Sequence, residues 1–248
     1  MRNKKTLLDY PVASENLDAI LAGLEVNQQD RVLCVGASGD QAFAILEEAG
    51  SVLVAETLGS QLDYIRRRRE LLKNGAYNKF LNAAREYGKE MVKVEANLPA
   101  ILYYFSKEGR LEKIRRNLKN LKLPRHSLDI FTAMQQKEYT KVYLSNLLTW
   151  GGKKAEKILF YLRQMAESIP SGCLVYVSDH LPVVYMIAPL MAREREIKEG
   201  EESLIKQRSL LETTSGILPE NLGLDIRLTN IARQLETGEW SPAVYRKI

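Results

Sequence analysis

With 248 residues, 45% of them hydrophobic, the chain is long enough for one complete α/β domain with insertions. No apolar run is long enough to span a bilayer, and no apolar segment follows the charged N-terminus, so we expect neither a transmembrane segment nor a signal peptide. Two cysteines and two histidines, without C-x-x-C or H-E-x-x-H, argue against a metal site and predict a reduced, cytoplasmic protein. The formal net charge of +5 favours an anionic partner only weakly.

The first predicted element is a helix from about Ser14 to Leu24, with Ser14 and Asn16 as candidate N-caps. Its position ahead of the first strand leaves two interpretations. It lies across the mouth of a binding site, or it only covers the sheet.

An apolar run at 32–35 predicts a buried strand, and a helical pattern with inward-facing apolar residues follows over 42–46. Between them lies a turn of small residues. Strand, small-residue turn and helix together form an anion- or nucleotide-binding cradle in an α/β sheet, because glycine lets a ligand approach the backbone. The cofactor contacts that we assign to this motif are Gly36, Ala37, Ser38, Gly39 and Asp40.

A second strand is predicted at 51–56, and it ends on Glu56, where a ribose-binding carboxylate belongs in this architecture. The glycines at 36 and 39 do not complete G-x-G-x-x-G, because position 42 is alanine. Asp40 likewise breaks the G-x-S-x-G pattern of a hydrolase elbow. We therefore favour a site for S-adenosylmethionine (SAM) over a dinucleotide site.

A long helical region follows the second strand. The helix predicted over 62–74 carries four consecutive arginines, 66–69, which span a full turn and are interpreted as a solvated face. Residues 76–125 form a predicted helical insertion before the third strand. Within it, 98–105 is apolar and aromatic and is interpreted as core or as the wall of a pocket for an apolar substrate.

The end of this insertion, 107–125, is both basic and amphipathic. It contains eight Lys or Arg residues against two Glu residues, and its apolar residues recur at helical spacing. Such a segment can lie on an anionic membrane surface, or it can be an ordinary surface helix packed by its leucines. Nucleic acid ranks below lipid as a partner, since no aromatic-rich RNA-binding motif is present.

Polar residues follow three further predicted strands. The third strand is placed at 128–131, the fourth at 142–144 and the fifth at 173–177. Ligands bind at the carboxyl ends of strands in open α/β sheets. This assigns Asp129 to the adenine end of the cofactor and Asp179 or His180 as general base. Ser145 and Asn146 are assigned to the methionine end of the cofactor, to orienting a nucleophile, or to capping a helix.

The C-terminal part contains a highly charged, mostly helical segment at 185–212 and then a predicted antiparallel hairpin. The hairpin pairs 225–234 with 243–248 and completes a seven-stranded, mostly parallel sheet. The predicted organisation is one SAM methyltransferase-like (Rossmann-type) α/β domain over 1–248, with the insertion 76–125 embedded in it.

Three of these motifs resemble the SAM-dependent 3-amino-3-carboxypropyl transferases of betaine-lipid synthesis, which act on diacylglycerol. The segment 32–46 is similar to that family's S-x-G-x-N/D turn, and Glu56 with Gly59-Ser60-Gln61 is similar to its Asp and the polar turn ending in Gln. Tyr143-Leu-Ser-Asn146 and the helical insertion also match. The resemblance implies that Gln61 belongs to the cofactor site, and that the chain transfers an aminocarboxypropyl group to a lipid hydroxyl.

Two alternatives remain open at this point. Methyl transfer from SAM uses the same cradle, and spacing does not separate it from aminocarboxypropyl transfer. A non-catalytic membrane- or nucleic-acid-binding protein could keep the same sheet, with the basic segment 107–125 as its contact surface.

Overall fold

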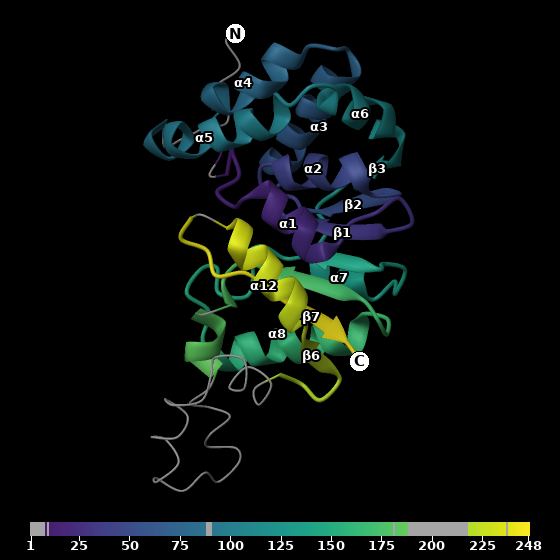
Figure 1. Cartoon of the computed structure of the whole chain (residues 1–248), viewed down its shortest axis with the longest axis vertical. Coiled ribbons are helices and arrows are strands. Elements are labelled where there is room, and N and C mark those ends of the chain that lie inside the picture. Colours follow the sequence, from purple (N-terminus) through teal and green to yellow (C-terminus); the bar gives the residue numbers. More distant parts are fainter. Residues whose placement is uncertain (1–7, 9, 88–90, 181, 188–217, 237) are drawn as a thin grey trace, which may run out of the picture.

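The computed structural model describes residues 8, 10–87, 91–180, 182–187, 218–236 and 238–248. Within these residues, seven strands form one sheet in the order β3-β2-β1-β4-β5-β7-β6 (Figure 1). The strands are β1 Arg31–Val35, β2 Ser51–Ala55, β3 Leu121–Lys122, β4 Lys141–Tyr143, β5 Leu174–Val177, β6 Leu222–Leu224 and β7 Ala243–Lys247. Only β7 runs antiparallel to its neighbours. This is the SAM methyltransferase-like fold, so the predicted fold class is confirmed.

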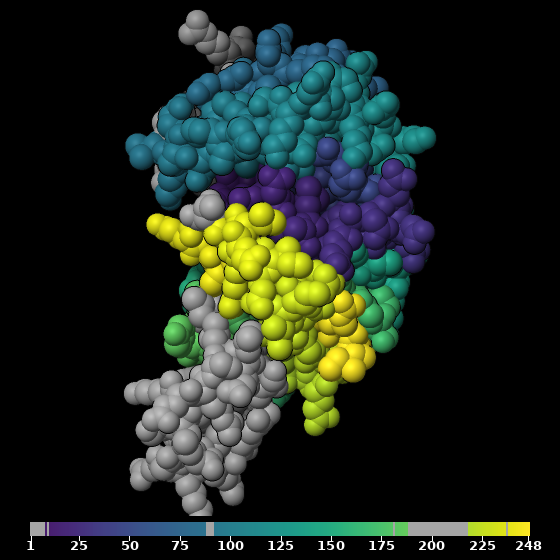
Figure 2. All heavy atoms as spheres, in the orientation of Figure 1, coloured from purple at the N-terminus to yellow at the C-terminus, as the bar shows by residue number. Residues whose placement is uncertain are grey.

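Helices cover both faces of the sheet because successive strand residues point to opposite sides. In β1, Val32 and Cys34 pack into one core cluster, whereas Leu33 belongs to the other. The helices with buried residues in the first cluster include α1 Leu17–Leu24, α2 Asp40–Glu48, α3 Gly59–Lys73 and α12 Ile226–Leu235. The second cluster contains α7 Ile130–Met134 and α8 Ala155–Ser168. Figure 2 shows α12 lying against the N-terminal part of the chain on one face.

The insertion forms a helical cap beyond α2 and α3, with α4 Tyr77–Tyr87, α5 Met91–Phe105 and α6 Arg110–Asn117 (Figure 1). The predicted apolar segment 98–105 is core, since Ile101, Tyr104 and Phe105 are buried in the first cluster. Within the described part of the chain, no helix combines the length and the apolar character that crossing a bilayer requires.

A continuous basic helix over 107–125 is not what the structure shows. The helix α6 ends at Asn117, and a 3-10 turn then leads directly into β3. Its apolar residues Leu111 and Ile114 are buried in the core, and two of its cations are paired with acids of α2. Arg110 forms an ion pair with Glu47, and Lys113 forms one with Glu48. The inner side of α6 is therefore packed against α2.

Two strand predictions are wrong, for identifiable reasons. Residues 128–131 are not a strand: the third strand is Leu121–Lys122, too short to give a hydrophobic pattern. The first arm of the hairpin, predicted at 225–234, is instead the helix α12 Ile226–Leu235, whose buried Leu228 and Ala232 repeat at helical spacing. The strand β7 pairs antiparallel with β5 on one side and with the preceding strand β6 on the other. Most of the charged segment 185–212 lies outside the described residues.

The arginine run 66–69 is not uniformly solvated, because Arg68 is only 3% exposed. Its Nη1 lies 2.7 Å from Oδ1 of Asp40 and donates to the carbonyl oxygen of Ser38 at 3.0 Å. The guanidinium also stacks over the ring of Phe80, 4.2 Å from its centroid. This buried ion pair fixes α3 against the turn that follows β1.

Replacing Arg68 with methionine leaves the Asp40 carboxylate buried without its cation. We expect Arg68→Met to lower the free energy of unfolding by about 3–5 kcal/mol, measured by urea denaturation. Arg67→Met on the same helix is the matched control, since Arg67 is exposed; its cost should stay below about 1 kcal/mol. Similar losses in both variants would contradict the importance of the buried pair.

Candidate functional site

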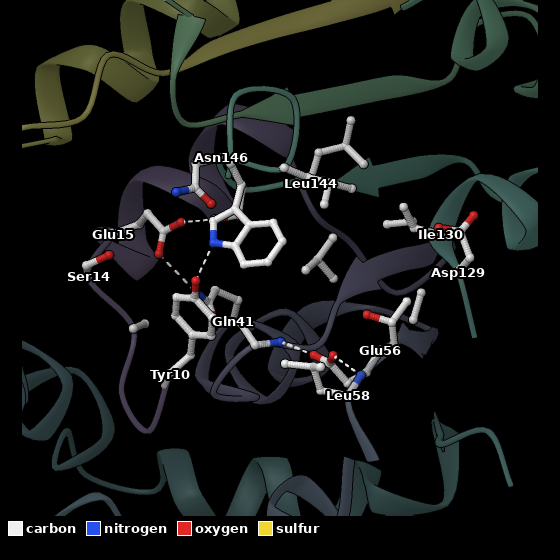
Figure 3. A pocket seen from close by; sticks show the side chains of 18 of the residues that line it. Tyr10, Ser14, Glu15, Gln41, Glu56, Leu58, Asp129, Ile130, Leu144 and Asn146 are labelled. Atoms are coloured by element: carbon white, nitrogen blue, oxygen red, sulfur yellow. Dashed lines mark hydrogen bonds between the residues drawn. The ribbon is translucent and has the colours of Figure 1, made fainter. Parts of the chain in front are cut away.

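A cavity opens at the carboxyl ends of β1, β2 and β4, where the topology predicts a ligand site (Figure 3). It holds about 960 Å³ of space when the open solvent at its mouth is included. The residues that line it are Tyr10, Val12, Ala13, Ser14, Glu15, Val35, Ala37, Gln41, Ala55, Glu56, Thr57, Leu58, Leu128, Asp129, Ile130, Leu144, Ser145, Asn146, Leu147, Trp150 and Trp240.

The turn after β1 brings backbone close to the cavity. Ala37 and Gly39 both have positive φ, 39° and 83°. A Cβ on Gly36 would lie 2.8 Å from both Cβ and Oε2 of Glu56 and 3.1 Å from Cγ1 of Val54. Position 36 therefore requires glycine, because any side chain there displaces the carboxylate that follows β2.

Glu56 is held by backbone donors at the cavity wall. The N–H of Ala37 donates to Oε2 at 2.9 Å, and the N–H of Leu58 donates to Oε1 at 2.8 Å. Burial raises the pKa of the Glu56 carboxyl, while these N–H donors act to lower it. Because both oxygens are oriented by main chain, the carboxylate presents its remaining lone pairs at a fixed position, as recognition of a vicinal diol requires.

Five of the ten predicted cofactor residues line the cavity: Ala37, Glu56, Asp129, Ser145 and Asn146. Asp129 also caps α7, since its Oδ1 accepts from the N–H of Thr132 at 3.0 Å. It thus reaches the cavity from a helix N-terminus, although the sequence placed it on a strand.

The other five lie behind the wall and support it: Gly36, Ser38, Gly39, Asp40 and Gln61. Gln61 donates from Nε2 to the carbonyl oxygen of Ala37 at 2.7 Å and also to that of Tyr10. Asp40 accepts from Ser38 Oγ at 2.9 Å and from the N–H of Ala13 at 2.8 Å. These polar residues connect the turn to the N-terminal segment.

The residue that sequence reasoning missed is Glu15. Its side chain lines the cavity from the N-terminal segment, yet the residue is only 5% exposed. Its Oε1 accepts from the hydroxyls of Tyr143 at 2.8 Å, Ser178 at 3.2 Å and Ser145, and its Oε2 accepts from Nε2 of Gln41 at 2.9 Å. In the sequence, Glu15 stands between two candidate caps and shows no signal of its own.

Aromatic side chains at the cavity were also not predicted. Tyr10 and Trp150 meet edge to face, with centroids 6.4 Å apart and planes at 65°, and the indole Nε1 of Trp150 donates to the Tyr10 hydroxyl. Trp240, from the loop before β7, donates from Nε1 to the carbonyl oxygen of Ser14 at 3.2 Å. These bonds hold the segment ahead of α1 against the cavity from two sides, whereas α1 itself packs on the sheet in the first core cluster.

The predicted general bases lie outside the lining of the cavity. Asp179 is buried and accepts from the hydroxyl of Thr149, and burial raises the pKa of its carboxyl. His180 is fully buried, with Nδ1 2.8 Å from the Tyr245 hydroxyl, and burial lowers its pKa to about 3. A base must come within hydrogen-bond reach of the proton that it abstracts. Their catalytic role stays a prediction that this cavity does not support.

Comparisons with known proteins found no matching family model and no match among curated proteins. Solved structures do resemble the chain. N-methyltransferase NodS from Bradyrhizobium japonicum, in complex with S-adenosyl-L-homocysteine, matches 94% of this chain and 85% of its own, at 9% identity and TM-score 0.47. An RNA methyltransferase from Salinibacter ruber matches 66% of this chain and 73% of its own, at 16% identity and TM-score 0.38. A putative O-methyltransferase from Nostoc punctiforme matches 94% of this chain and 56% of its own, at 12% identity and TM-score 0.43.

The buried imidazole of His180 makes stability depend on pH. Its folded pKa of about 3 lies below the unfolded value of 6.5, so only the unfolded chain takes up the proton between these values. Stability should therefore fall as pH drops from about 6.5 toward 3, by up to about 1.4 kcal/mol per pH unit from this group. The free energy of unfolding, measured by urea denaturation at several pH values, should fall less steeply with decreasing pH in His180→Gln than in the unchanged protein.

His126→Gln is the matched control, because His126 is exposed. In this variant the free energy of unfolding should depend on pH as it does in the unchanged protein. If His180→Gln retains the full slope as well, the acid sensitivity comes from other groups.

Proposed function

We propose that this protein is a SAM-dependent transferase, and that it binds SAM in the cavity at the ends of β1, β2 and β4. The observation that carries this proposal is the oriented carboxylate of Glu56, fixed by two backbone N–H groups after β2. A carboxylate at this place in a Rossmann-type sheet is suited to accept hydrogen bonds from the two hydroxyls of a ribose.

The charge of the cavity supports SAM over a dinucleotide. Its charged lining residues are Glu15, Glu56 and Asp129, and within the described residues no Lys, Arg or His lines it. A pyrophosphate would be repelled there, whereas the sulfonium and ammonium groups of SAM are cations. The same argument favours a neutral acceptor over a phosphate-bearing one in this cavity.

The transferred group is proposed to be 3-amino-3-carboxypropyl, and the acceptor a hydroxyl such as that of a diacylglycerol. The support is the similarity of the turn 32–46, of Gln61 and of 143–146 to that transferase family. The acceptor oxygen attacks the methylene carbon next to sulfur, the carbon–sulfur bond breaks, and methylthioadenosine leaves with the electron pair. The acceptor's proton passes to a base or to water. Alignment of nucleophile and carbon is the main task of the protein.

Contact with an anionic membrane is part of this proposal. The outer side of α6 and the turn after it keep the exposed residues Arg115, Arg116 and Lys119. Lys122 on the edge strand β3 is also exposed. These cations are suited to anionic headgroups, and they would place the protein at the surface from which a lipid acceptor comes.

Product analysis tests the transferred group. Incubation with SAM and diacylglycerol in anionic vesicles should yield methylthioadenosine, detected by mass spectrometry, in an amount equal to the modified lipid. Formation of S-adenosylhomocysteine instead would assign methyl transfer, which is the alternative function. A reaction without protein measures spontaneous SAM breakdown, which also releases methylthioadenosine.

Binding measurements test the cavity itself. Replacing Glu56 with alanine removes the acceptors for the ribose hydroxyls, so we expect SAM affinity to fall about 10- to 100-fold by calorimetry. Glu70→Ala is the matched control: Glu70 is an exposed glutamate on α3, away from the cavity, and should leave affinity unchanged. If the unchanged protein, Glu56→Ala and Glu70→Ala all bind SAM equally well, the nucleoside does not bind at Glu56.

A further inference from the structure

Glu15 is a buried carboxylate whose charge has no counter-ion in the described part of the chain. Its four hydrogen-bond donors are a phenol, two hydroxyls and an amide, all of them neutral. None of the ion pairs found between described residues includes Glu15. Neutral donors satisfy the oxygens but do not compensate the charge, so a cation brought by a ligand is favoured at this place.

The hydrogen bonds of Glu15 also leave an acceptor direction open. Oε1 receives three donors from the ends of β4 and β5, whereas Oε2 receives one, from Gln41. Because Oε2 accepts one donor where Oε1 accepts three, Oε2 can accept a further donor. Since Glu15 lines the cavity, that donor can come from a bound molecule.

Glu15 and Glu56 stand at separate sides of the cavity, with Gln41 and Tyr10 between them in the view of Figure 3. Glu56 follows β2, and Glu15 is bonded to Tyr143 at the end of β4. The two carboxylates therefore lie at the ends of the two strands that flank β1, so one elongated ligand that lies across the end of β1 can contact both.

We propose that Glu15 binds the primary ammonium group of the amino-acid part of SAM. This inference rests on the proposed function and adds the residue that recognises the group to be transferred. An ammonium carries three N–H donors and fits a carboxylate oxygen with an open lone pair, whereas a sulfonium has no donor. The role is ligand binding, so it is separable from the chemistry of transfer.

Three ligands separate the contributions. SAM carries ammonium and sulfonium, S-adenosylhomocysteine carries ammonium only, and methylthioadenosine carries neither. We expect Glu15→Gln, which keeps the shape of the side chain, to weaken SAM and S-adenosylhomocysteine by about 10- to 100-fold in calorimetry. Its affinity for methylthioadenosine should stay within twofold of the unchanged protein.

Glu47→Gln is the matched control, because Glu47 is equally buried but lies outside the cavity lining. Loss of SAM affinity alone would assign Glu15 to the sulfonium, and an equal loss for all three ligands would assign it a structural role; either result overturns the proposal. If the unchanged protein binds none of the three, the proposed function fails with it. If it binds them and Glu15→Gln changes nothing, only this inference fails.

A second measurement needs no folded variant. The unchanged protein is titrated with S-adenosylhomocysteine and with its analogue that lacks the amino group. We expect the analogue to bind at least about tenfold more weakly. Equal affinities would mean that no group of the cavity recognises the ammonium, and the proposal would be overturned.

Discussion

The carboxylate of Asp40 joins three parts of the chain that build the cavity. It pairs with Arg68 of α3 at 2.7 Å, accepts from Ser38 in the turn after β1, and accepts from the N–H of Ala13 in the N-terminal segment. A buried carboxylate is stable only when such partners compensate its desolvation. Since Glu15 is two residues beyond Ala13, the same interaction that orders the turn also sets the position of Glu15.

The buried carboxylates of Asp40 and Glu15 differ in whether a cation of the protein compensates their charge. Asp40 has its cation, Arg68, within the fold, and the residue is 1% exposed and outside the cavity lining. Glu15 has only neutral donors and faces the cavity. Hydrogen bonds alone fix its rotamer but leave a negative potential in a low-dielectric place, and a cationic ligand gains most from such a potential.

The sequence was sufficient for β1 and β2 and for the residues that follow them, because the long apolar runs 32–35 and 51–55 have one interpretation. It failed where a strand is only two residues long, at 121–122, and where a capped amphipathic helix, 226–235, also satisfied a strand pattern. Glu15 could not be found, because its partners are Gln41 and residues from 143 to 178, and only the folded sheet brings these together.

The net charge of the chain is positive, whereas the charged residues of the cavity are negative. The chain carries +5 overall, which at the level of composition favours an anionic partner, yet the charged residues of the cavity are all acidic. The difference arises because the cations lie elsewhere: Arg110 and Lys113 pair with α2, and Arg115, Arg116 and Lys119 face solvent beyond it. Screening confines each potential to about 8–10 Å, so a basic outer surface and an acidic cavity act independently. An anionic surface can thus hold the protein from outside without competing with a cation for the cavity.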